Sequence, residues 1–90
     1  MYANAVNRGE DPHDLLEAVP WDRVAYVHVA GGEMVDGLYH DTHVHGVPDD
    51  VLKLVRDIRP RAAMLERDGR YPPAAELRAE LEAVAEAAWG

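Results

Sequence analysis

Apolar residues recur at two different spacings along this 90-residue chain, and segments of the two kinds alternate. Helical spacing predicts three helices, which begin near Pro12, Pro48 and Pro73, because proline is tolerated in a first helical turn. Asp11 supplies an N-cap acceptor for the first. The apolar stripes are Leu15, Leu16 and Val19; Val51, Leu54, Val55 and Ile58; and Leu77, Leu81, Val84 and Ala88. The mixed segment 2–7 is assigned to neither kind of element.

Three shorter runs are rich in β-branched, aromatic or other apolar residues and predict strands at 23–28, 38–44 and 62–66. Residues 33–37 are expected to form a loop. The order is therefore helix, strand, strand, helix, strand, helix, which is typical of an α/β protein with a mostly parallel sheet. A parallel sheet must be covered on both faces. Because three short strands make a small sheet, we expect residues 1–90 to be a single, partial domain of a larger structure.

Composition narrows the class of protein. Nine basic and 17 acidic residues give a formal charge of −8, which disfavours nucleic acid and anionic lipid as partners. A content of 48% hydrophobic residues excludes a disordered chain, and the absence of cysteine excludes thiolate metal sites. Neither a signal peptide nor a stretch long enough to span a bilayer is recognisable. We therefore expect a cytoplasmic protein with no membrane partner.

The densest group of chemically capable side chains is the segment His40-Asp41-Thr42-His43-Val44-His45. In an extended strand alternate side chains share a face, so Asp41, His43 and His45 are expected to point the same way. Carboxylate and imidazole donors suit iron, manganese or zinc. The alternative is a solvated, histidine-rich turn, and the spacing leaves both interpretations open.

His28 and Glu66 close two other predicted strands. Each has an ordinary structural explanation: a core histidine bonded to a carbonyl group, and a strand that reaches the surface. However, both residues and the Asp41–His43 segment lie at the carboxyl ends of predicted strands, where α/β proteins build their sites. We therefore expect these side chains to converge.

Other polar residues carry weaker signals. Asn4 and Asn7 would either contact a substrate or satisfy the backbone of a turn, and the turn is the simpler explanation. Acidic residues of the last helix are expected to form a solvated face: Glu76, Glu80, Glu82 and Glu86. Asp57, Arg59 and Arg61 are also expected at the surface.

Four segments, taken in order and with their spacing, resemble one known family. They are Tyr2-Ala-Asn4-Ala-Val-Asn7-Arg-Gly9-Glu-Asp11-Pro12; His28-Val-Ala30-Gly31; Asp41-Thr42-His43 with Val47-Pro48; and Leu65-Glu66-Arg67-Asp68 followed by Pro72-Pro73 and Glu76-Leu77. The chain resembles the C-terminal third of the multinuclear non-haem iron-dependent oxidases that are similar to MbnB and TglH. Gly32 and Val44 depart from this pattern, because the family often has histidine and aspartate there.

The resemblance implies a xylose-isomerase-like TIM barrel, of which this chain would be the C-terminal part, incomplete as a barrel by itself. It implies iron as the cofactor, with His28, Asp41, His43 and Glu66 as ligands. Residues for substrate or neighbouring contacts would be Asn4, Asn7, His45 and Asp68. It also implies O₂-dependent modification of cysteine in ribosomally made peptides, with a partner protein that delivers the peptide. Without the ligands of the earlier strands, the chain is expected to be inactive alone.

Two other interpretations remain open. The chain would act as a non-catalytic module that binds metal incidentally and self-associates through exposed strand edges. Alternatively, it would belong to a sugar-isomerase- or endonuclease-like barrel that uses zinc or manganese.

Overall fold

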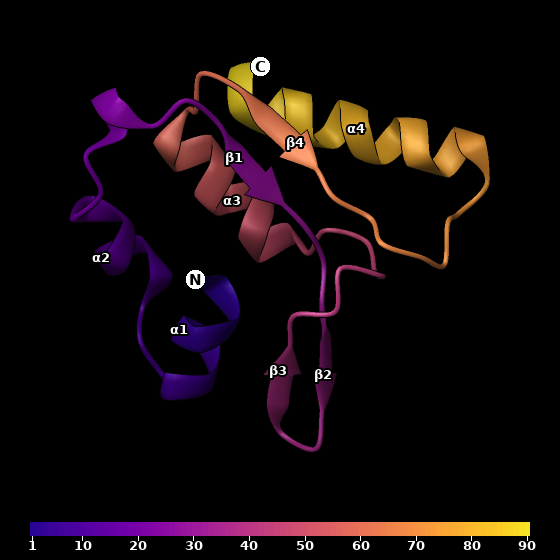
Figure 1. Ribbon diagram of the computed structural model, residues 1–90, viewed down its shortest axis with the longest axis horizontal. Coiled ribbons are helices and arrows are strands. Elements are labelled where there is room, and N and C mark those ends of the chain that lie inside the picture. The colour runs from indigo at the N-terminus through magenta and orange to yellow at the C-terminus, as the bar shows by residue number, and fades with distance from the viewer.

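The computed structural model describes residues 1–90 and has an α/β fold with short strands (Figure 1). Its elements are the helices α1 (Tyr2–Arg8), α2 (Pro12–Glu17), α3 (Asp49–Ile58) and α4 (Ala74–Trp89), the 3₁₀ turn η1 (Trp21–Arg23), and the strands β1 (Val27–Val29), β2 (Glu33–Val35), β3 (Leu38–His40) and β4 (Ala63–Leu65). The predicted helices after Pro12, Pro48 and Pro73 are confirmed. No helix is both long and apolar enough to cross a bilayer.

The strands form two separate two-stranded sheets rather than one mostly parallel sheet. β1 and β4 pair in parallel, with His28 opposite Met64, whereas β2 and β3 form an antiparallel hairpin. The expected loop at 33–37 is therefore wrong. Asp36 and Gly37 have positive φ angles of 51° and 80°, as a two-residue hairpin turn requires, and the Asp-Gly pair is the sequence signal for it.

Two other boundaries differ from the prediction. The segment 2–7 forms most of α1, which ends where Gly9 adopts a left-handed φ of 69° and its N–H caps the helix. The strand expected at 23–28 is instead β1, because η1 includes Arg23, residues 24–26 are irregular, and the strand runs on to Val29. His28 therefore lies within β1 rather than at its end. At α2 the predicted cap is confirmed, since the Asp11 carboxylate accepts a hydrogen bond from the His13 N–H at 2.9 Å.

The core lies between the β1–β4 sheet and the helices α3 and α4, and its buried members are Val29, Val55, Val84, Ala87 and Ala88. Only nine of 90 residues are buried, so the chain has a small core for its length. The stripe of α3 is confirmed, with Leu54 and Val55 buried. The stripe of α4 is confirmed at Val84 and Ala88, which are buried, but not at Leu81, which is 50% exposed. Glu80 lies instead on the packed side, in line with Val84.

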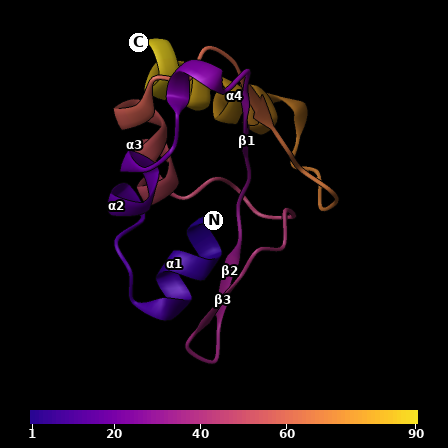
Figure 2. The ribbon, with the colours of Figure 1, turned by 60° about the vertical axis from the view of Figure 1, so that its left-hand side comes forward.

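The other face of the β1–β4 sheet is open. Met64 is 49% exposed and His28 lies beside it, whereas Val29 and Leu65 contact the core. α1 lies beside the β2–β3 hairpin in both ribbon views (Figures 1 and 2). A cavity of about 430 Å³ opens among α1, α2, β1 and α3, and most of its lining is apolar. His28, which lies on the open face beside Met64, also lines the cavity.

Candidate metal centre

His43 lies in an irregular segment that follows β3, and its backbone adopts a left-handed φ of 59°. Its N–H donates to the Gly31 carbonyl at 3.0 Å, and its own carbonyl accepts from the Asp68 N–H at 2.6 Å. The predicted strand 38–44 therefore ends at His40. Residues beyond His40 do not form a strand, yet Asp41 and His43 still meet, with Oδ1 and Nε2 2.8 Å apart. The expectation that His45 shares their face is wrong, because His45 contacts Thr42 and Glu33 instead.

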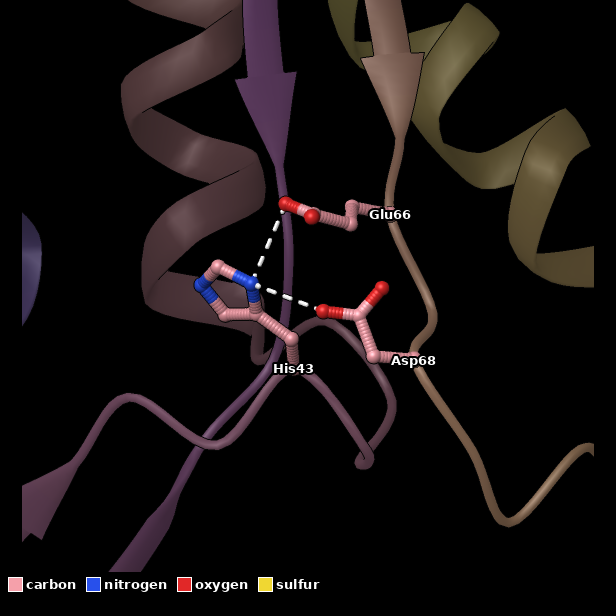
Figure 3. Close-up of side chains that lie close together, drawn as sticks. All are labelled: His43, Glu66 and Asp68. Atoms are coloured by element: carbon pink, nitrogen blue, oxygen red, sulfur yellow. Dashed lines mark ion pairs between the residues drawn. The ribbon is translucent and has the colours of Figure 1, made fainter.

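Glu66 and Asp68 approach His43 from the end of β4 (Figure 3). The Glu66 N–H donates to the Val29 carbonyl at 2.9 Å, which extends the contact of β1 and β4 by one residue. His43 Nδ1 lies 3.0 Å from Glu66 Oε2 and 3.4 Å from Asp68 Oδ2. One ligand atom from each of the three residues lies within 4.8 Å of the others. This group is the most compact set of metal-ligating side chains in the chain.

Asp41 and His28 extend this group on two sides. Asp41 Oδ1 lies 2.8 Å from His43 Nε2, on the opposite side of the ring from Glu66, and His28 Nδ1 lies 3.6 Å from Glu66 Oε2. All four predicted ligands therefore converge, and all four line the same cavity. The compact group, however, contains Asp68, which the resemblance placed among the neighbouring contacts. That these residues bind an ion stays a prediction.

The electrostatics of the group favour positive charge. Burial by itself would lower the pKa of His43, but the negative charges of Asp41, Glu66 and Asp68, with a hydrogen bond to Asp41, raise it above its usual value of 6.5. A protonated imidazole is therefore stabilised among three carboxylates. A metal cation that displaces this proton would be attracted by the same three carboxylates.

The donor set fits a divalent first-row metal ion. It consists of imidazole nitrogen and carboxylate oxygen, the ligand types common to iron, manganese and zinc. Nδ1 of His43 faces Glu66 and Asp68, so it is the nitrogen that would bind the ion. The Nε2–H group would then remain to donate to Asp41. A carboxylate in that position orients a ligating histidine and increases its basicity.

The remaining predicted site residues lie apart from this group. Asn4 is exposed and makes no side-chain hydrogen bond, while the Asn7 amide bonds to both backbone groups of Tyr39, at 2.6 and 2.8 Å. His45 Nδ1 lies 2.7 Å from Thr42 Oγ1, and its Nε2 lies 3.5 Å from Glu33. Asn7 thus holds α1 against β3.

Sequence analysis missed the partnership of Arg67 and Glu80. Glu80 was expected on a solvated helix face, yet its side chain is only 14% exposed and its Oε2 lies 2.9 Å from Arg67 Nη1. The signal available was helical spacing, because Glu80 precedes the buried Val84 by four residues. Asp57, Arg59 and Arg61 are exposed, as predicted.

The fold and this group of side chains define an α/β protein with a candidate metal centre at the carboxyl ends of its parallel strands. The family model described as "RiPP precursor modification enzyme MbnB/TglH/ChrH" matches residues 1–88, and the chain belongs to this family. The resemblance found in the sequence motifs is thereby confirmed.

Curated relatives carry the description "UPF0276 protein". The chain is 46% identical to one from Streptomyces avermitilis over 88 residues, which cover 93% of this chain and 18% of the relative. It is 45% identical to one from Caulobacter vibrioides, covering 99% of this chain and 33% of the relative. A relative from Pseudomonas aeruginosa is 40% identical over 96% of this chain and 32% of its own length. The chain thus spans a third or less of these relatives. No solved structure matches it.

Proposed function

We propose that this chain carries part of the metal centre of an iron-dependent oxidase that modifies a ribosomally made peptide. The observation that carries this proposal is the approach of His43 to Glu66 and Asp68 at the carboxyl ends of β1 and β4. Membership of a family of RiPP precursor modification enzymes supports a peptide as the substrate. Cysteine as the modified residue, and a second protein that delivers the peptide, are part of the same proposal.

Each residue of the group has a distinct task in this proposal. His43, Glu66 and Asp68 hold the ion, Asp41 orients the His43 ring through Nε2, and His28 reaches the same position from β1. When bound, iron supplies the capacity to activate O₂. The mostly apolar cavity beside the group, which His28, Asp41, His43 and Glu66 help to line, offers room for part of the substrate.

The arrangement of β1, α3 and β4 supports a further part of the proposal. Two parallel strands joined through a helix are the repeating unit of a TIM barrel, and barrel enzymes build their sites at the carboxyl ends of the strands. Because this chain has one such pair and spans a third or less of its relatives, the other ligands would come from other strands of a complete barrel. We therefore expect this chain to bind metal without turning over a peptide.

Native mass spectrometry after anaerobic loading with Fe(II) tests the proposal. We expect one retained iron per chain, which is lost in the double variant Asp41→Ala/His43→Ala. A matched control is His13→Ala/Asp57→Ala, because it removes another histidine–aspartate pair, with Nδ1 and Oδ2 2.7 Å apart, at a distance from the group. Equal iron in wild type and in the Asp41/His43 variant would contradict the proposal. Loading with zinc and manganese in competition reports the preferred metal.

A second candidate function is self-association. The β1–β4 sheet has two unpaired outer edges, and its open face exposes Tyr26 at 54% and Met64 at 49%. Such edges and apolar side chains tend to pair with another chain. Dimers or larger species without retained iron in the same spectra would favour this function over the metal centre.

A further inference from the structure

Arg67 and Glu80 form the most shielded ion pair of the chain, with both side chains only 14% exposed. Arg67 Nη1 donates to Glu80 Oε2 at 2.9 Å, and Arg67 Nη2 donates to the Arg70 carbonyl at 3.2 Å. The Nε atom of the same guanidinium is buried without a partner. The positive charge of Arg67 is therefore balanced by a single carboxylate, that of Glu80.

The position of Arg67 links this ion pair to the candidate metal centre. Arg67 stands between Glu66 and Asp68, whose side chains both face His43 (Figure 3). The Arg67 side chain instead reaches α4, where its Nη1 donates to Glu80 Oε2. Anchoring Arg67 thus restrains the backbone that carries two of the ligand-type side chains.

The second carboxylate oxygen of Glu80 contacts the segment that carries His43. Oε1 accepts a hydrogen bond from the Val47 N–H at 3.1 Å, and Val47 lies in the irregular segment that contains His43. One carboxylate on a helix therefore contacts both segments that bring ligand-type side chains together. Between the backbones of those two segments, the direct link is the hydrogen bond from the Asp68 N–H to the His43 carbonyl.

We propose that Glu80 is a positioning residue for the metal centre, which sets the distance between the His43 segment and the Glu66–Asp68 segment by binding Val47 N–H with one oxygen and Arg67 with the other. This inference rests on the metal centre proposed above. It assigns to α4 a role in metal affinity, although α4 supplies none of the candidate ligands.

Glu80→Gln is the test, because its single amide oxygen cannot both accept from Val47 and neutralise Arg67. We expect Glu80→Gln to weaken Fe(II) binding by about 10-fold, the lower end of the effect of losing a partner bonded directly to a ligand, because Glu80 contacts the ligand-bearing segments and not the ligands. It should also change the visible spectrum of the Co(II)-loaded protein, which reports ligand geometry. Glu82→Gln makes the same chemical change at an exposed position on α4 and should leave both readouts unchanged.

Val84→Ala tests whether Glu80 acts only by stabilising the fold, because this variant removes core packing from the same helix without touching the contacts of Glu80. We expect this variant to lower the melting temperature while retaining Fe(II) affinity and the Co(II) spectrum well below that temperature. Wild-type affinity in Glu80→Gln would overturn the proposal. The proposal would also be overturned if Val84→Ala lost Fe(II) affinity as Glu80→Gln does, in proportion to the drop in melting temperature of each variant.

Amide hydrogen exchange tests the positioning role of Glu80 even in a protein that binds no metal. If the wild type retains no metal, the metal centre fails, but the Asp68 amide still reports the distance between the two segments, because it bonds to His43 and not to Glu80. Faster exchange of this amide in Glu80→Gln, with no change in Glu82→Gln, supports the positioning role. Unchanged exchange refutes it.

Discussion

The backbone N–H of Asp68 donates to the carbonyl of His43 at 2.6 Å, while the side chain of Asp68 faces the imidazole of the same residue at 3.4 Å. The two residues are 25 positions apart and belong to separate irregular segments. Because this backbone bond involves none of the ligand-type side chains, exchanging one of those side chains should change the donor set and leave the bond between the segments in place. Ligand roles can therefore be compared by conservative substitutions.

Glu66→Gln should weaken metal binding more than Asp41→Asn does. Glu66 faces the nitrogen of His43 that also faces Asp68, whereas Asp41 contacts the opposite ring nitrogen. Asparagine at position 41 still offers an oxygen to Nε2–H of His43. Asp41→Asn should therefore lower metal affinity by about 10–100-fold, as expected for a residue that orients a ligand without binding the ion. Competition titrations with Fe(II) or Zn(II) measure both variants. A larger loss for Asp41→Asn would instead place Asp41 on the ion.

The metal-free protein should show a His43 pKa above 6.5, which Asp41→Asn lowers. A titration of the His43 ring proton by NMR measures it directly. Since the folded pKa exceeds the unfolded one, this group stabilises the fold fully below the unfolded pKa, and the contribution is lost as pH rises through the folded pKa. His43→Gln should remove that part of the pH dependence of unfolding. A His43 pKa at or below 6.5 in the wild type would contradict the arrangement of the three carboxylates.

Gly31→Ala should destabilise the protein, because a Cβ atom there would collide with the backbone carbonyl oxygens of His45 and Gly46. Neither oxygen can move away like a side-chain tip, so the cost should reach about 1–3 kcal/mol or more. Gly46→Ala is the matched control, since its Cβ would meet only Glu80 Oε2, at 4.0 Å. Chemical denaturation compares the two. Equal stability of both variants would mean that the His43 segment does not pack on Gly31.

Asn7→Ala should lower the free energy of unfolding by about 1 kcal/mol, because its amide makes two hydrogen bonds to the backbone of Tyr39. The loss should be accompanied by weaker packing of the Tyr2 ring, whose centroid lies 5.2 Å from that of Tyr39. Asn4→Ala, on the same helix and without a side-chain hydrogen bond, should change stability little. The same denaturation measurement decides the case, and a larger effect at Asn4 would refute this assignment.

Local signals predicted α2, α3, α4 and β4 well. The Asp11 cap, the stripe at Leu54 and Val55 and the short run that ends at Leu65 act over a few residues, so they are readable without the fold. α1 was missed because it has only seven residues and depends on Asn7 and Tyr39, which are far apart in sequence. The β2–β3 hairpin had a usable signal in Asp36-Gly37.

The sequence by itself determined the family and the kinds of donor that stand at the strand ends, because both depend on residue type and order. Only the tertiary structure decided which donors meet. The left-handed backbone of His43 and its bonds to Gly31 and Asp68 turn the ring toward Glu66 and Asp68, and separate it from His45. Glu80 was likewise placed by the fold, since a carboxylate is buried only where a cation such as Arg67 reaches it.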